Sequence, residues 1–175
     1  MQKTIWLFGG IAGVLSALLE YLFYSGQNFN SQSLYLSKII LLAICVIFGL
    51  ILIKKLLGGI ISIGRTILSG IMISVVKSII AIAVFLVLYA PSGEFYAKHV
   101  EQAKIESIKI INDNTTLEEG EKADKIVEAH SYIEGQFKPW GYSFSTLLEG
   151  LITSFVISVL MAAFIAKNMM YQDQT

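Results

Sequence analysis

Four long stretches that almost lack charged residues constrain this chain more than any other feature of its sequence. They run over residues 4–24, 34–53, 66–90 and 144–166, and each contains a single charged residue. A helix rises 1.5 Å per residue and the hydrocarbon layer of a membrane is about 30 Å thick, so about 20 apolar residues can cross it. The sequence therefore predicts four transmembrane helices.

The composition favours membrane helices over the buried helices of a soluble protein. Hydrophobic residues make up 55% of the chain and charged residues 15%, against about 25% charged residues in ordinary soluble domains. The first stretch is longer than the roughly 7–15-residue core of a signal peptide, so we expect it to be retained. The predicted fold class is all-α: an integral membrane four-helix bundle in one domain, residues 1–175, with an extramembrane helical hairpin at 91–143.

Charge and cysteine content exclude several classes of function. The net charge is zero, which gives no electrostatic basis for binding nucleic acid. The single cysteine, Cys45, excludes an intrachain disulfide and a multi-cysteine zinc site. His99 and His130 stand alone, so we expect no metal site and no cofactor. No P-loop, nucleophile elbow or zinc-protease motif is present, and we expect the protein not to be an enzyme.

The distribution of basic residues predicts the orientation in the membrane. Lysine and arginine favour the cytoplasmic side. If the chain crosses the membrane four times, five basic residues lie on one side of it: Lys3, Lys54, Lys55, Arg65 and Lys167. The long segment 91–143 holds six lysines and ten acidic residues and would face the opposite side. The sequence thus predicts an inner-membrane protein with both termini in the cytoplasm.

The segment between the third and fourth spans has the pattern of two amphipathic helices. In the first helix, apolar residues recur every three to five positions: Tyr96, Val100, Ala103, Ile108 and Ile111. Thr116 and Glu119 have the spacing of a capping box for the second. Its apolar face would hold Ala123, Ile126, Val127, His130, Ile133 and Phe137. The hairpin could pack on itself, lie on the bilayer or present a surface to a partner or ligand. Trp140 and Tyr142 follow it as an interfacial aromatic belt.

Small residues at steps of four mark the packing faces of three spans. Helices in lipid associate through close backbone approach and hydrogen bonds, which small residues permit. The first ridge is Gly9, Gly13 and Ala17; the second is Ser62, Thr66, Gly70, Ser74 and Ser78; the third is Gly150, Ser154, Ser158, Ala162 and Ala166. The span at 34–53 lacks such a ridge, and we expect it to be the most lipid-exposed.

Three charged residues within the spans form a candidate site: Glu20, Lys77 and Glu149. At 100° per residue, Glu20 and Lys77 share faces with the small-residue ridges of their own helices. A lone charge in the apolar layer is costly, so we predict that Lys77 points inward and pairs with Glu20 or Glu149. The alternatives are a proton or ion relay, a site for an anionic lipid headgroup, and a lysine that snorkels to the interface.

The link between the second and third spans is basic and contains adjacent glycines. Lys54, Lys55 and Arg65 flank Gly58 and Gly59, with no acidic residue between them. Such a turn is typical of a cytoplasmic anchor, and it could also bind an anionic lipid headgroup.

The order of these features resembles a bacterial membrane-protein family, domain of unknown function 4199. The resemblance rests on the run from Lys54 to Ser62, on Gly70, on Tyr89 with Pro91, on the acidic helical insert, and on the Glu149-Gly150 entry to a last span ending in Lys167. It implies a four-helix inner-membrane protein, but it does not indicate a reaction, a substrate or a catalytic residue. Lys77 matches no position of that pattern.

Together these patterns predict a non-enzymatic, multi-pass inner-membrane protein that is structural or that binds a protein or lipid. Membrane lipids are its expected partners, with a homo-oligomer or another membrane protein as further ones. The alternative is a small transporter or channel component that uses Glu20, Lys77 and Glu149. Four helices make a thin wall for a pore, so this alternative requires an oligomer.

Overall fold

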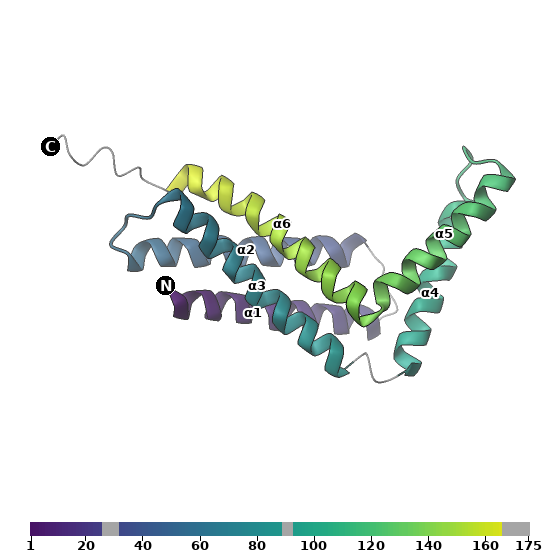
Figure 1. Cartoon of the computed structure of the whole chain (residues 1–175), viewed down its shortest axis with the longest axis horizontal. Helices are drawn as coiled ribbons and strands as arrows, with labels where there is room; N and C mark the ends of the chain where they lie inside the picture. Colours follow the sequence, from purple (N-terminus) through teal and green to yellow (C-terminus); the bar gives the residue numbers. More distant parts are fainter. Residues whose placement is uncertain (26–31, 89–92, 166–175) are drawn as a thin grey trace. The chain divides into compact units, whose positions relative to one another are not determined.

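The computed structural model describes residues 1–25, 32–88 and 93–165 (Figure 1). These residues contain six helices and no strand. The helices are α1 (Gln2–Ser25), α2 (Gln32–Leu56), α3 (Ile63–Leu88), α4 (Gly93–Asn112), α5 (Glu119–Phe137) and α6 (Pro139–Ile165). The prediction of an all-α chain is confirmed. The expectations for Tyr89, Pro91, Ala166 and Lys167 fall outside the described residues.

Four of the helices are long and apolar enough to cross a membrane. They are α1, α2, α3 and α6, and the apolar segments run over Gln2–Phe23, Ser33–Leu56, Ile63–Val87 and Pro139–Ile165. These segments mark the chain as a membrane protein. The last span begins five residues earlier than residue 144, the start predicted from the sequence. The reason is that proline suits the first position of a helix, where its missing N–H would have no partner.

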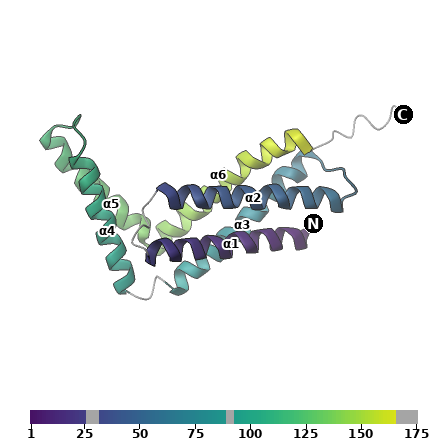
Figure 2. The same ribbon diagram turned by 180° about the vertical axis from the view of Figure 1, so that it is seen from behind.

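The chain forms two compact units. One comprises residues 1–83 and 146–175, and the other comprises residues 84–145. The first unit contains α1, α2 and most of α3 and α6, and Figure 2 shows α1 and α2 side by side. Its largest apolar cluster joins α1, α2, α3 and the link after α2, through Ile5, Leu42, Val46, Leu50, Ile53, Ile61, Ile73 and Val76.

The expectation that the second span is the most lipid-exposed is wrong. In the 18-residue apolar stretch of α2, 33% is buried within the structure, whereas only 22% of the corresponding stretch of α6 is buried. The cause is that α2 packs large aliphatic side chains, among them Val46 and Leu50, both at 0% exposure. Its Gly49 also receives the side chain of Ile73, since a Cβ there would lie 2.7 Å from Ile73 Cδ1. Small-residue ridges are therefore only one of the ways in which these helices pack.

A tight turn joins α2 to α3. Gly58 and Gly59 have φ angles of 75° and 89°, a region that residues with a Cβ rarely adopt. The N–H groups of both glycines donate to the last carbonyls of α2, Gly58 to Lys55 and Gly59 to Lys54. The α2 C-terminus is thereby capped by its own turn.

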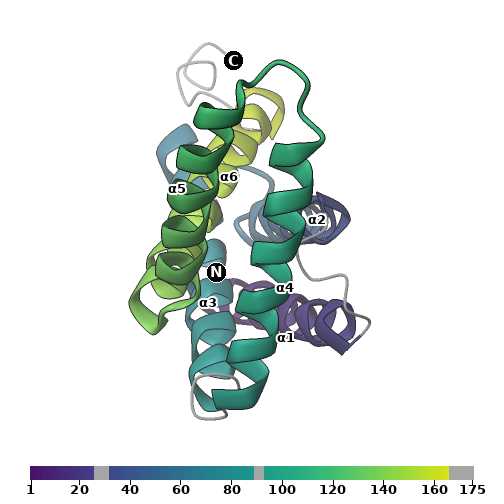
Figure 3. The same cartoon turned by 90° about the vertical axis from the view of Figure 1, so that its right-hand side faces the viewer.

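The second unit contains the hairpin of α4 and α5, which Figure 3 shows side by side. Val100 and Ala103 of α4 and Ile133 of α5 are buried, as the apolar spacing predicts. Val127 is not, because 70% of it is exposed, and Ala123 is exposed as well, which corrects the placement of both residues on the inner face. The side chain of Tyr96 is outside the described residues.

The start of α5 also differs from the sequence prediction. The N-cap is Glu118 rather than Thr116, and its N–H donates to the Glu121 carboxylate at 3.2 Å. Thr116 does not fill that role: its N–H and its hydroxyl both donate to Oδ1 of Asn114, at 2.9 and 2.7 Å, and the helix begins only at Glu119. This local turn keeps Thr116 outside the helix.

Close packing fixes the junction of α5 and α6 within the second unit. Lys138 alone separates the two helices. A Cβ on Gly141 would lie 2.0 Å from the Gly135 carbonyl oxygen, so only glycine fits there. Tyr142 is buried and stacks on Phe85 of α3, with ring centroids 3.8 Å apart, whereas Trp140 is 80% exposed. Of the two aromatic residues expected at the interface, only Trp140 is free to meet lipid headgroups.

Candidate functional site

A buried ion pair joins the first two spans. Nζ of Lys38 on α2 donates to Oε1 of Glu20 on α1 at 2.5 Å. The side chains are only 11% and 3% exposed. Along its own helix, Glu20 lies about 8 Å from the end of α1 and Lys38 lies about 9 Å from the start of α2, and the same link joins these two helix ends. The two charges therefore meet at one depth, where each offsets the desolvation of the other.

Lys77 of α3 lies deeper and is 1% exposed. It is 11 residues from the end of α3, or about 17 Å along the helix. Glu149 and Glu20 both attract its ammonium group electrostatically, and Lys38 repels it. No described carboxylate lies within 4 Å of it. The inward direction expected of Lys77 agrees with its burial, but the cation that pairs with Glu20 is Lys38.

Glu149 of α6 completes the cluster. It lies 10 residues from the start of α6, about 15 Å along the helix and thus near the depth of Lys77. It attracts both lysines. The intramembrane charged cluster is therefore Glu20, Lys38, Lys77 and Glu149, with two charges of each sign. Such a balanced set limits the cost of placing charges in the apolar layer.

Lys38 is the member that sequence reasoning missed. It lies near the start of its span, where a lysine can reach the headgroups without any partner. The sequence does contain a signal for Lys38: Glu20 and Lys38 are separated from the link between α1 and α2 by similar numbers of residues. In an antiparallel pair, residues at equal distance from the connection lie at equal depth.

The small residues of α3 and α6 lie against each other. A Cβ on Gly70 would lie 1.8 Å from Ser158 Oγ, and one on Gly150 would lie 2.8 Å from Ser78 Oγ. Ser78 also donates to the Thr146 carbonyl at 3.3 Å. These contacts bring the two backbones close together, as small residues allow in lipid.

The ridge of α1 lies against α3 instead. A Cβ on Gly9 would lie 2.6 Å from the Val76 Cβ and 2.8 Å from the Ile73 carbonyl oxygen. A Cβ on Gly13 would lie 2.7 Å from the Ile80 Cβ. The closeness of backbone atoms leaves no room for a methyl group at either glycine.

Several hydroxyl groups accompany these contacts. Ser154 is buried and donates to the Leu151 carbonyl at 3.2 Å. Ser16, Ser74 and Ser158 are 0% exposed, and none of their hydroxyls has a hydrogen-bond partner among the described residues. The interior of the first unit is therefore polar as well as tightly packed.

The basic turn places its three cations on both sides of the link between α2 and α3. Lys54 and Lys55 occupy the last turn of α2, and Arg65 is the third residue of α3. Lys55 and Arg65 are exposed, and Lys54 is partly exposed. The N–H of Arg65 donates to the Ser62 hydroxyl at 3.4 Å, so Ser62 caps α3 rather than packing in the ridge.

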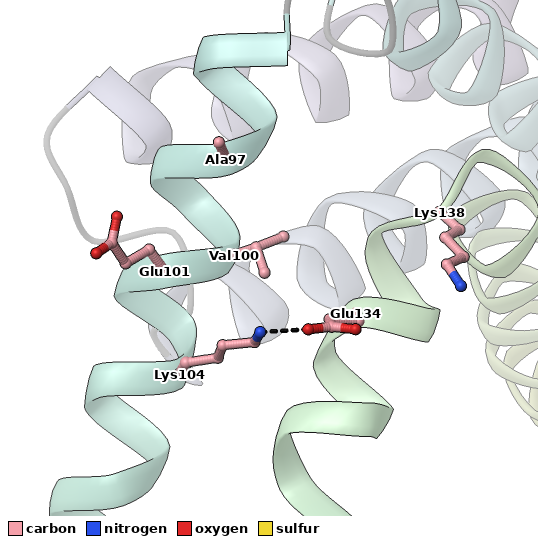
Figure 4. A pocket seen from close by; sticks show the side chains of 6 residues that line it. All are labelled: Ala97, Val100, Glu101, Lys104, Glu134 and Lys138. Carbon is pink, nitrogen blue, oxygen red and sulfur yellow. Dashed lines mark hydrogen bonds and ion pairs between the residues drawn. The ribbon is translucent and has the colours of Figure 1, made fainter.

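The hairpin has a groove of about 420 Å³ near the end of α5. Its lining includes Lys104 of α4 and Glu134 of α5, which form an ion pair across the groove (Figure 4). Hydrogen bonding and charge from Lys104 lower the pKa of the exposed Glu134 carboxyl. In Figure 4, Glu101 extends away from this pair, while the charge of Lys138 also lowers the pKa of Glu134. The groove thus contains an ion pair that is open to solvent.

The described residues contain no group of three potential metal-ligating side chains. Nε2 of His130 is buried and has no hydrogen-bond partner among them, and the side chain of His99 lies outside them. In the charged cluster, Glu20 and Glu149 attract Lys38 and Lys77 electrostatically.

A family model described as Protein of unknown function (DUF4199) matches residues 7–167. This match covers most of the chain, and the chain belongs to that family. Comparisons with curated proteins and with solved structures gave no match. The resemblance based on the run from Lys54 to Ser62 and on the helical insert is confirmed.

Proposed function

For this member of a family of unknown function, we propose a non-catalytic, structural role as a multi-pass protein of the bacterial inner membrane. In this proposal the four spans form a membrane bundle that carries the α4–α5 hairpin outside the membrane. The hairpin is the surface for another membrane protein or a second copy of the chain. Lipids surround the bundle.

The observation that carries the proposal is the buried Lys38–Glu20 pair. Its 2.5 Å contact uses the charge of Glu20 to hold α1 against α2. Close contacts at glycine and serine residues likewise hold α3 against α1 and against α6. The polar groups of the interior thus support a scaffold. A transport pathway through Glu20, Lys77 and Glu149 is not favoured, because Glu20 is already neutralised in place.

The orientation we propose puts both termini and the basic turn in the cytoplasm and the hairpin on the exported side. Support comes from Lys3, Lys54, Lys55 and Arg65, which favour the cytoplasmic face. Single cysteines in a Cys45→Ala background test it with a membrane-impermeant thiol reagent on intact inner-membrane spheroplasts. Gly120→Cys should react before lysis, and the matched Ser62→Cys should react only after lysis. The reverse pattern would overturn the orientation.

In-cell photo-crosslinking tests the role of the hairpin. A photoreactive amino acid at the exposed positions Val127 and Tyr132 should give one discrete crosslinked product. The same probe at Lys125, which forms an exposed pair with Glu128, is the matched control for a solvated position. The absence of a discrete product at all positions of α4 and α5 would contradict an interaction role.

A further inference from the structure

We propose that the turn between α2 and α3 is a binding site for one anionic phospholipid, with its phosphate held by Lys54, Lys55 and Arg65. The site is specific in its chemistry: a phosphodiester headgroup next to acyl chains. The inference deepens the proposed membrane scaffold and rests on the chain being a membrane protein, but it does not depend on which face of the membrane the turn occupies.

The first argument is unbalanced charge. Residues 54–65 contain three cations and no acidic residue, and no described carboxylate forms an ion pair with any of them. Elsewhere among the described residues, Lys38, Lys104, Lys122 and Lys125 each have a glutamate partner, whereas Lys3, Lys77, Lys109 and Lys138 have none within 4 Å but do not cluster as the three cations of the turn do along the chain. The turn is thus left with a local charge of about +3, which attracts an anion at a membrane surface.

The second argument is that the turn is held in place. Ile61 is 1% exposed and belongs to the apolar core, and Leu57 packs against that core. The N–H groups of Gly58 and Gly59 are used within the turn. The cations therefore project from a fixed frame, and a ligand need not order the loop before it binds.

The third argument is the apolar surface beside the cations. Leu56 is 61% exposed and Ile63 is 49% exposed; one follows Lys55 directly and the other lies two residues before Arg65. A soluble anion would leave both side chains in water, whereas a phospholipid covers them with its acyl chains while its phosphate meets the cations. The positive end of the α3 dipole lies at the same place and adds to the attraction.

Lipid retention in native mass spectrometry tests the site. The full chain in mild detergent is mixed with equal amounts of dioleoyl phosphatidylglycerol and dioleoyl phosphatidylcholine. We expect phosphatidylglycerol to be retained preferentially. Replacing Lys54, Lys55 and Arg65 together by glutamine should abolish the preference, and each single change should reduce it about fivefold, as expected for about 1 kcal/mol per cation.

The matched control removes three lysines of the hairpin instead, the exposed Lys109 and Lys125 and the partly buried Lys122, through Lys109→Gln, Lys122→Gln and Lys125→Gln. It should keep the preference, and equal loss in this control would overturn the site. Undiminished preference in the turn variant would overturn it as well. Arg65→Lys keeps the charge and should retain binding, which separates loss of the site from misfolding.

Soluble glycerol phosphate distinguishes a lipid from a free phosphate ester. At concentrations equal to the lipid it should not displace phosphatidylglycerol, because it cannot cover Leu56 and Ile63. Efficient displacement would contradict a lipid site. A failed lipid result with intact topology would remove this site alone, and a reversed topology with intact lipid preference would remove only the proposed orientation.

Discussion

The two compact units each contain a lysine–glutamate pair that joins neighbouring antiparallel helices, but the two pairs have different surroundings. Lys38 and Glu20 join α2 to α1 with side chains 11% and 3% exposed. Lys104 and Glu134 join α4 to α5 with side chains 25% and 52% exposed. The same chemistry is therefore placed in an apolar layer in one unit and in water in the other.

The comparison shows that burial decides what an ion pair contributes. In the hairpin, water solvates Glu134 whether or not Lys104 is present, so the loss of either partner costs little. In the membrane unit, removal of one partner leaves the other without compensation in an apolar surrounding. The pair in the first unit is therefore a structural requirement, while the hairpin pair is replaceable.

Lys38→Met should give the largest effect. The change leaves the Glu20 carboxylate buried without its 2.5 Å partner, and breaking a buried pair costs about 3–5 kcal/mol. Thermal unfolding in mild detergent measures the loss. An unchanged melting temperature would show that Glu20 does not need Lys38, and would remove the difference between the two units.

Gly9→Ala should cost less, about 1–3 kcal/mol, the usual cost of overpacking. The new methyl group would lie 2.6 Å from the Val76 Cβ and 2.8 Å from a backbone oxygen, so α1 must move from α3. Gly10→Ala is the matched control, because nothing lies within 4 Å of its Cβ. The same unfolding assay should show Gly10→Ala neutral or slightly stabilising. Equal effects of both changes would contradict the close α1–α3 contact.

Lys77→Met should have a smaller effect, a loss of about 1 kcal/mol. The change removes the attraction toward Glu149 and Glu20, but it also removes the repulsion from Lys38 and the cost of burying an ammonium group. The measurement is again the free energy of unfolding in detergent. A loss as large as that of Lys38→Met would show that Lys77 contributes as much as Lys38, and a larger loss would make Lys77 the principal cation of the cluster.

Lys104→Met in the hairpin should have the smallest effect, with little change in melting temperature at neutral pH. The pKa of Glu134 is lowered by Lys104, so its contribution is present at neutral pH. This contribution is lost as the pH falls through the lowered pKa. Acid titration by circular dichroism should show a slightly steeper loss in the wild type than in Lys104→Met. Identical acid profiles would mean that this pair contributes nothing.

The sequence predicts the spans well because membrane helices need long apolar stretches, whatever their neighbours. It also points to Glu20, Lys77 and Glu149 as residues within these stretches. It does not predict that Glu20 takes Lys38 as its partner. Angular position on one helix says which way a side chain points, whereas pairing depends on the relative depth of two helices.

The errors in the hairpin have a similar origin. Thr116 and Glu119 have the spacing of a capping box, but Asn114 binds Thr116 first. The capping-box pattern considers only the two residues that define it, and it leaves out a neighbour such as Asn114 that can bond to one of them. The exposure of Val127 arises because the face of α5 that packs on α4 is narrower than its full set of apolar residues.

A double-mutant cycle on Glu20 and Lys38 tests the central claim most directly. Glu20→Gln, Lys38→Met and the double variant are unfolded in the same detergent, and the coupling energy is the part that is not additive. We predict a coupling of about 2–3 kcal/mol, with the double variant more stable than Lys38→Met alone, because no buried charge remains unpaired. Additivity of the two single changes within about 0.5 kcal/mol would contradict the account, since it would mean that the buried pair does not hold α1 to α2.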